Sequence, residues 1–205
     1  VIEGGIVQFS VDSNLASSAR IVINAGTLQN TAATAVGLTN DVVLGGNQAT
    51  VNVSNVAGNL TLGGVVSGQT LTKVGTGVLT LTNTANSHAA TVLGGGVLNI
   101  DGGDAVLGTV PGVPSTNLTF SGASALQVGG STVTLNPNRV MLIKNGITAT
   151  NDVGAGGVLV LGGGVTGTGT LVKAGSGTLK LNGAINEQID DTIYLAVNSG
   201  IFDLN

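Results

Sequence analysis

Short stretches of alternating apolar and polar residues recur along the whole 205-residue chain. A period of two is typical of a half-buried β-strand, and the Gly, Asn and Ser residues between the stretches are turn formers. In the first third of the chain the stretches cover residues 5–9, 20–23, 26–29, 41–44, 50–53 and 59–62. The pattern predicts an all-β chain of short strands.

Regularly spaced short strands fit two architectures, an antiparallel sandwich or barrel and a stacked β-helix. The separators between these stretches vary in length and are not consistently the two-residue Asn-Gly or Asp-Gly turns of hairpins. Variable separators are what the corners of a β-helix require, so we expect a β-helix.

One motif occurs twice without a gap, in residues 63–86 and again in residues 163–186. Self-similarity at a fixed spacing indicates a repeat architecture. The recurring positions, which we expect to be the structural core of the repeat, are Leu71, Lys73, Gly75, Gly77, Leu79 and Leu81 in the first copy and Leu171, Lys173, Gly175, Gly177, Leu179 and Leu181 in the second.

This motif resembles the passenger-associated β-strand repeat of bacterial autotransporters, which reads approximately G-x-G-x-L-x-K-x-G-x-G-T-L-x-L-x-G-x-N. The chain departs from that pattern where Val78 replaces the usual threonine and where the first copy ends TNTAN without a glycine. The resemblance implies a right-handed parallel β-helix that belongs to a secreted, surface-displayed passenger of a Gram-negative bacterium.

A second signature, Gly-x-apolar-polar-apolar, begins at Gly5, Gly96 and Gly200. We therefore interpret the chain as a single β-helix segment of two repeats, about 1–95 and 96–199, with residues 200–205 beginning a third. At about 20–25 residues per coil, we expect about eight to ten coils and a rod about 40–50 Å long.

The chain opens and closes on this signature, so we expect both copies to lie on the same side of the rod. Unpaired strand edges readily pair with another chain. The pattern predicts head-to-tail contact, either covalently in a parent protein or between separate copies, through Ile6, Val7, Phe9, Ile201, Phe202 and Leu204. We see no amphipathic capping helix at either end of the sequence.

Composition narrows the function classes. Only 8% of the residues are charged, against about a quarter in typical domains. The net charge of −4 and six scattered Lys and Arg residues argue against a nucleic-acid partner. Cysteine is absent, which excludes disulfides and thiolate metal sites.

No apolar run reaches the about 18 residues of a membrane helix, and no signal peptide is visible at Val1. We therefore expect no membrane insertion by this segment and a place in a larger, processed polypeptide.

The candidate chemistry is sparse. The single histidine, His88, has no catalytic partners in sequence, and we expect it at a corner or on the surface. The acidic turn at Asp101 and Asp104 is a weak imitation of a calcium loop. Glu187, Asp190 and Asp191 form an acidic cluster that we interpret as a solvated loop rather than a glycosidase site. We predict no catalytic residues, no metal and no cofactor.

The two motif lysines, Lys73 and Lys173, are expected at corners, with the apolar stem on the rod and the ammonium in water.

We accordingly expect a non-enzymatic, extracellular stalk that is exported across the outer membrane and supports export and display. The alternatives are an adhesin that contacts host or neighbouring cells, a self-assembling filament subunit and, less well supported, a polysaccharide-active enzyme. The expected partners are flanking repeats or further copies joined end to end.

Overall fold

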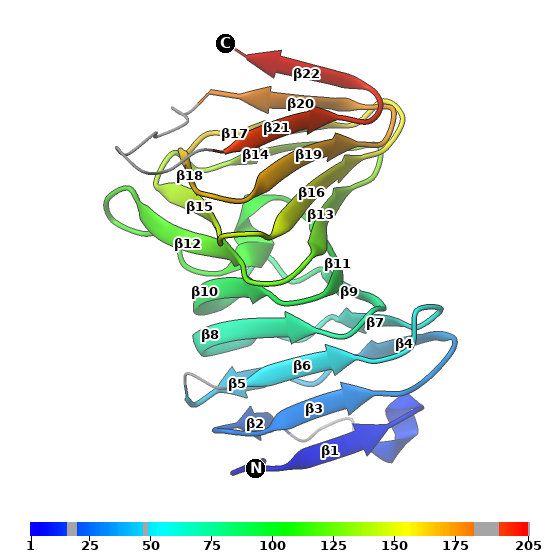
Figure 1. The fold of residues 1–205 in the computed structure, drawn as a ribbon. Helices are drawn as coiled ribbons and strands as arrows, with labels where there is room; N and C mark the ends of the chain where they lie inside the picture. The colour runs from blue at the N-terminus through cyan, green and yellow to red at the C-terminus, as the bar shows by residue number, and fades with distance from the viewer. Residues whose placement is uncertain (16–19, 47–48, 183–192, 205) are drawn as a thin grey trace.

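The computed structural model describes residues 1–15, 20–46, 49–182 and 193–204. Within these residues the chain forms a parallel β-solenoid, which confirms the predicted β-helix (Figure 1). The longest unbranched run of stacked strands in one sheet counts eight, so the rod has about eight coils. Helix in the described part is limited to two short 3-10 turns, η1 (Asp12–Asn14) and η2 (Asp104–Leu107).

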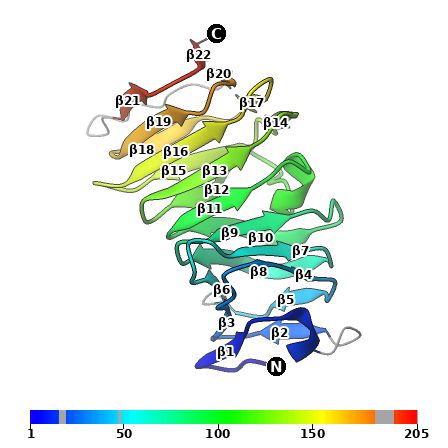
Figure 2. The ribbon, with the colours of Figure 1, turned by 90° about the vertical axis from the view of Figure 1, so that its right-hand side faces the viewer.

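Every strand pair in the three sheets is parallel, and successive coils stack along the rod (Figure 2). The first sheet has ten strands. They are β1 (Ile6–Phe9), β2 (Ile21–Ile23), β3 (Thr27–Asn30), β5 (Val42–Leu44), β6 (Thr50–Val53), β8 (Val66–Val74), β10 (Ser87–Leu93), β12 (Ser115–Phe120), β15 (Arg139–Ile143) and β18 (Val165–Gly167).

The second sheet has eight strands. They are β4 (Ala35–Leu38), β7 (Asn59–Leu62), β9 (Val78–Leu81), β11 (Gly96–Asn99), β13 (Ser124–Val128), β16 (Thr148–Val153), β19 (Thr170–Ala174) and β21 (Tyr194–Val197). The third sheet has four strands and lies in the C-terminal half. They are β14 (Thr132–Leu135), β17 (Val158–Leu161), β20 (Thr178–Leu181) and β22 (Ile201–Leu204).

The core is a set of apolar columns that run along the rod. In the second sheet Leu60, Leu79 and Leu98 are consecutive partners in register, and each is fully buried. Their neighbours on the strand face outward, so burial alternates as the sequence predicts. Burying a leucine side chain contributes about 1.5–3 kcal/mol, so stability accumulates coil by coil.

Residues 70–81 and 170–181, the central parts of the two motif copies, each form two strands joined by a glycine corner, but the two copies lie on different sheets. Residues 70–74 of the first copy belong to β8 in the first sheet, whereas residues 170–174 form β19 in the second sheet. The strands that follow, β9 and β20, are displaced in the same sense, from the second sheet to the third. The motif sequence therefore determines the local conformation, but it does not determine on which side of the rod a copy lies.

The same displacement corrects the expectation that the end signatures share one side. From β1 four strand-pairing steps lead to β10, and the chain then enters the second sheet at β11. From β11 four further steps lead to β21, and the chain then enters the third sheet at β22. Between one signature and the next, the chain completes four coils and then continues onto the next sheet. Successive signatures therefore lie on successive sides of the rod.

Different elements lie at the two ends of the described rod. At the N-terminal end the 3-10 turn η1 lies beside β4, the first strand of the second sheet. None of its three residues is buried, so η1 is not the amphipathic cap that would shield the whole end. At the C-terminal end β21 and β22 are the last described strands of their sheets.

The corners are compact and depend on glycine. Gly75 has a φ of +79°, and an added Cβ would lie 2.2 Å from Asn52 Oδ1 and 2.3 Å from the Val53 carbonyl oxygen. Its counterpart Gly175 has a φ of +72° and is equally crowded by the coil beneath. Gly146 also has a positive φ, +69°, but an added Cβ there would meet nothing within 4 Å.

We predict that Gly75→Ala lowers the free energy of unfolding by about 3 kcal/mol, because it combines a left-handed backbone with a clash against the preceding coil. Gly146→Ala carries only the backbone cost and should lose about 1 kcal/mol. Denaturant unfolding of the two variants measures the difference. Equal losses would show that coil-to-coil contact at the corner is not limiting.

Candidate functional site

The two motif lysines are buried, and this is the main error of the sequence interpretation. Lys73 is 0% exposed and Lys173 is 1% exposed. In the column of the first sheet, the Lys73 position stands between Val51 and Leu93, both of which are buried. The ammonium therefore does not reach water at the corner. It ends inside the rod.

A cluster of three backbone carbonyls surrounds each ammonium, and we call this arrangement the lysine cage. Lys73 Nζ donates hydrogen bonds to the carbonyl oxygens of Val74 at 2.8 Å, Gly75 at 3.0 Å and Gly95 at 3.0 Å. The left-handed glycine turns the chain sharply, and the corner carbonyls need donors. An ammonium has three donors and no acceptor, which matches three carbonyls.

The second copy builds the same cage. Lys173 Nζ donates to the carbonyl oxygens of Ala174, of Gly175 at 2.8 Å and of Ser199 at 3.3 Å. In both cages two carbonyls come from the lysine's own corner and the third comes from the next coil. Each cage therefore ties one coil to the coil above it.

Burial lowers the pKa of the Lys73 ammonium from 10.5 to about 8. Burial also lowers the pKa of Lys173, and the charge of Asp152 partly opposes this effect. A pKa of about 8 leaves Lys73 protonated at neutral pH, so all three donors of its cage are present.

The other predicted repeat positions have structural roles. Gly77 and Gly177 pack so closely on the preceding corner that an added Cβ would lie 2.4 Å and 2.3 Å from carbonyl oxygens. The six motif leucines all lie in the core: Leu71, Leu79, Leu81, Leu171, Leu179 and Leu181.

A buried arginine organises the region where the third sheet begins. Arg139 is 2% exposed, and its Nε donates to Asp104 Oδ1 at 2.8 Å. Its Nη atoms donate to Asn117 Oδ1 and to the carbonyls of Asp104, Leu107, Gly108 and Thr109. The guanidinium thus holds η2 and the segment after it against β12 and β15. Sequence inspection did not identify this role.

Asp101 and Asp104 belong to the acidic turn that we expected to be solvated rather than to bind calcium, and both carboxylates accept hydrogen bonds from protein donors. Gly129 N and Ser131 Oγ donate to Asp101 Oδ1 at 2.6 Å and 2.9 Å. Burial raises the pKa of Asp101, but hydrogen bonds from Gly129, Asn99 and Ser131 outweigh burial and leave it below its ordinary value. Asp104 Oδ1 accepts a hydrogen bond from Arg139 Nε at 2.8 Å. No group of three or more His, Cys, Asp or Glu in the described residues is arranged to hold a metal.

His88 is also buried, contrary to the expectation of a corner or surface position. It lies in β10 with 0% exposure, and its Nε2 is 3.0 Å from Thr91 Oγ1. Burial lowers the pKa of His88 from 6.5 to about 4, a hydrogen bond to the Val66 backbone raises it, and the Arg139 charge lowers it further. His88 therefore lies in the core of the rod as a neutral imidazole at neutral pH.

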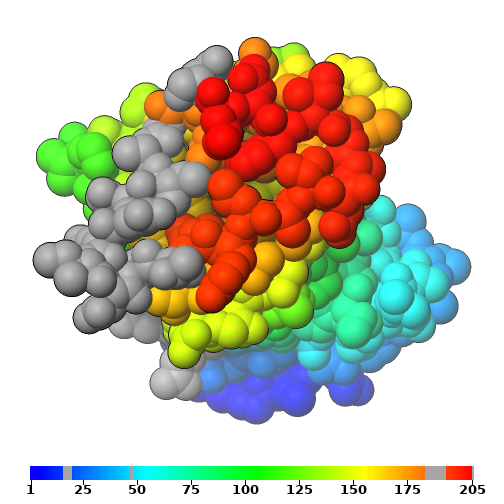
Figure 3. All heavy atoms as spheres, turned by 45° about the horizontal axis from the view of Figure 1, so that its top comes forward, coloured from blue at the N-terminus to red at the C-terminus, as the bar shows by residue number. Residues whose placement is uncertain are grey.

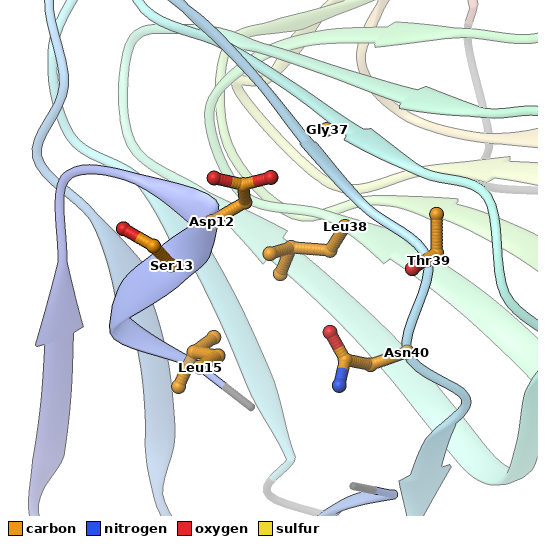
Figure 4. A pocket seen from close by; sticks show the side chains of 7 residues that line it. All are labelled: Asp12, Ser13, Leu15, Gly37, Leu38, Thr39 and Asn40. Atoms are coloured by element: carbon orange, nitrogen blue, oxygen red, sulfur yellow. The ribbon is translucent and has the colours of Figure 1, made fainter. Parts of the chain in front are cut away.

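Among the described residues, a pocket beside η1 contains a single acidic side chain. This pocket of about 380 Å³ lies between η1 and the end of β4, and its lining includes one carboxylate, Asp12, with Ser13, Leu15 and Asn40 (Figure 4). No histidine, lysine or arginine lines it. The predicted acidic cluster of Glu187, Asp190 and Asp191 lies outside the described residues. None of the described helices is long and apolar enough to cross a membrane.

The residues predicted for end-to-end contact lie at the two ends. Ile6, Val7, Ile201 and Leu204 are exposed, Phe202 is half-buried and Phe9 is buried. Whether they meet residues of another copy stays a prediction.

We predict that Lys73→Met destabilises the rod by at least about 2 kcal/mol, because three carbonyls lose their donors. Lys144→Met is the matched control, because Lys144 is exposed; it should change stability by less than about 0.5 kcal/mol. Thermal and denaturant unfolding measure both. A Lys73→Met protein as stable as the control would mean that water replaces the ammonium at no cost.

We also predict that the rod loses stability between pH 7 and pH 5. His88 has a folded pKa of about 4, below its ordinary 6.5, so in this window the unfolded chain binds a proton that the folded chain does not. The loss should be about 1–2 kcal/mol by linkage. His88→Leu should flatten the profile, since the chain has no other histidine. A wild-type profile that is flat over this range would contradict the burial of a neutral imidazole.

The comparisons with known proteins agree with this picture at a coarse level. No family model matches the chain, and no solved structure matches it either. A curated relative, the adhesin BmaC autotransporter of Brucella suis biovar 1 (strain 1330), is 30% identical over 184 residues. The match covers 84% of this chain but 5% of that protein. The chain is therefore similar to a small part of an autotransporter adhesin, and its solenoid fold is consistent with a passenger domain.

Proposed function

We propose that the chain is a β-solenoid stalk segment of a surface-displayed passenger of the autotransporter type. Its work is mechanical: it spaces a distal module from the outer membrane, and its folding outside the cell supports export. The observation on which this rests is the stack of about eight coils. At about 4.8 Å per coil the rod is about 40 Å long. Similarity to part of an autotransporter adhesin supports the cellular location.

The lysine cages suit this task. A chain exported unfolded must fold from one end, and a solenoid does so because each coil contacts mainly its neighbours. Each cage is completed only when the next coil supplies its carbonyl, Gly95 or Ser199. Addition of a coil thus satisfies polar groups that the previous coil leaves open, which favours stepwise growth over partial unfolding.

An adhesin role is the second candidate, and one surface feature favours it besides the name of the relative. The loop that leads into β12 projects from the side of the rod (Figure 1). Within it Val113 is 68% exposed and Val110 is 36% exposed. A groove of about 280 Å³ at its base is lined by Thr109, Pro111 and Asn117 among others. Exposed apolar side chains on a loop are a common feature of contact sites.

We do not propose an enzyme. Hydrolysis of a glycan would need paired carboxylates in a groove with binding platforms. Among the described residues, those that line the pocket beside η1 include one carboxylate and no aromatic side chain.

The export proposal predicts that the chain will be displayed when it is placed between a signal peptide and an autotransporter outer-membrane domain. Antibody labelling and protease treatment of intact Gram-negative cells measure display. Wild type should be labelled and resist protease, whereas Lys73→Met with Lys173→Met should be digested, because both coil-to-coil ties are lost. Retention of the wild type in the periplasm, while an unrelated passenger is displayed, would contradict the proposal.

Beads coated with the purified chain distinguish the adhesin alternative. Stalk function predicts no binding to host cells above that of uncoated beads. Binding that is lost in Val110→Asp with Val113→Asp would favour the adhesin.

A further inference from the structure

The tip of the turn between β15 and β16 is exposed and unpacked. The turn spans residues 144–147, and Ile147 N donates to the Lys144 carbonyl at 3.0 Å, which closes it at its base. Asn145 and Gly146 form the tip, and both are exposed. Gly146 has a φ of +69°, and nothing lies within 4 Å of an added Cβ. In Figure 3 yellow-green atoms from this part of the chain lie on the surface.

Two chemical groups at this tip are free to meet. Within the described structure the Gly146 N–H donates to no carbonyl, and the Asn145 carboxamide makes no hydrogen bond. Glycine has no side chain to shield its amide nitrogen, so that nitrogen can approach the carboxamide carbon of the residue before it closely. The chain has two Asn-Gly steps, and the structure describes both residues of this one.

We propose that Asn145 is a site of spontaneous deamidation through a cyclic imide with Gly146. The Gly146 nitrogen gives up its proton and attacks Asn145 Cγ. A new nitrogen–carbon bond forms, the bond between Cγ and the side-chain nitrogen breaks, and ammonia leaves with the proton. Water then opens the five-membered ring at either of its two carbonyls. The products are aspartate and isoaspartate, and the only co-reactant is water.

Other asparagines at the corners of the rod have their side chains held in place. The carboxamide oxygens of Asn55, Asn83 and Asn136 accept hydrogen bonds from the N–H two residues further along, at 3.0, 2.9 and 2.9 Å. Asn136 also precedes Pro137, which has no N–H to lose. Because the carboxamide must rotate toward the next nitrogen before the ring can close, these hydrogen bonds oppose the reaction.

The Asp101–Gly102 step shows that the glycine alone is not sufficient. An aspartate before a glycine can close the same ring by losing water. Here, however, Gly129 N and Ser131 Oγ donate to one carboxylate oxygen of Asp101, and Asn99 Nδ2 donates to the other at 3.1 Å. The structure therefore distinguishes a held step from a free one, and it selects Asn145.

The reaction changes the surface of the rod and leaves its strands paired. It adds a negative charge beside the exposed Lys144, so the net charge becomes one unit more negative than −4. Isoaspartate also lengthens the backbone by one methylene at the tip. Strand β16, which follows the turn, stays fixed by its pairing with β13 and β19. This inference concerns the purified chain and does not depend on the proposed role in export.

Incubation of the purified full chain in heavy-oxygen water at mildly alkaline pH tests the proposal. Samples are digested with pepsin at acidic pH, which suppresses further deamidation, and the peptides are mapped by mass spectrometry. The peptide that contains Asn145 should exchange its side-chain NH2 for a labelled OH several-fold faster than the peptides that contain Asn55, Asn83 or Asn136. It should separate into aspartate and isoaspartate forms. The rate should rise with pH, because the Gly146 nitrogen must lose its proton.

Two variants serve as controls. Gly146→Ala keeps the asparagine but places a methyl group beside the attacking nitrogen, and Asn145→Gln keeps the carboxamide but cannot form the five-membered ring. Both should convert several-fold more slowly than the wild type, and circular dichroism checks that both are folded. Three results would each overturn the proposal: conversion at Asn145 no faster than at Asn55 or Asn83, equal conversion in the wild type and Gly146→Ala, or a product without isoaspartate. All of these results are independent of surface display.

Discussion

In-register backbone pairing between successive coils is the constraint on which the rest of this structure depends. Because every strand pair is parallel, each residue lies over its counterpart in the coil beneath. Apolar positions then line up as columns, such as Leu60, Leu79 and Leu98. The same constraint fixes the corners, since the chain must turn within a few residues without departing from the coil below. Gly75 and Gly175 meet that demand with left-handed backbones that no side chain could share.

The lysine cages follow from those corners. A sharp turn takes carbonyl groups out of the ladder, and buried carbonyls without donors are costly. An arginine fork or a hydroxyl would supply a different number and geometry of donors, whereas an ammonium supplies three from a single point. The stem of Lys73 continues an apolar column while its tip satisfies three carbonyls. Lys73 thus packs in the core through its stem, satisfies the carbonyls of the corner through its ammonium, and links two coils.

The rotation of the repeat affects how such a rod presents its surface. Because the signature advances by four coils and one side at a time, features attached to equivalent positions do not form a straight line along the rod. They wind around it. A rod built in this way has no single favoured face. A projecting element such as the loop before β12 is therefore a local addition rather than a feature of the repeat.

The sequence by itself determined the strands, the corners, the apolar columns and the parallel solenoid, because these depend on local alternation and on a motif that recurs without a gap. The motif leucines are buried, and the motif glycines pack against the coil beneath. Only the tertiary structure decided that Lys73 and Lys173 are buried, because the carbonyls of Gly95 and Ser199 come from other coils. It also decided the burial of His88, whose partner in register, Gly68, lies in another coil. It also decided which side of the rod each copy occupies. The side on which a copy lies depends on the summed length of all the coils between the two copies. The residues of the motif itself carry no information about this length.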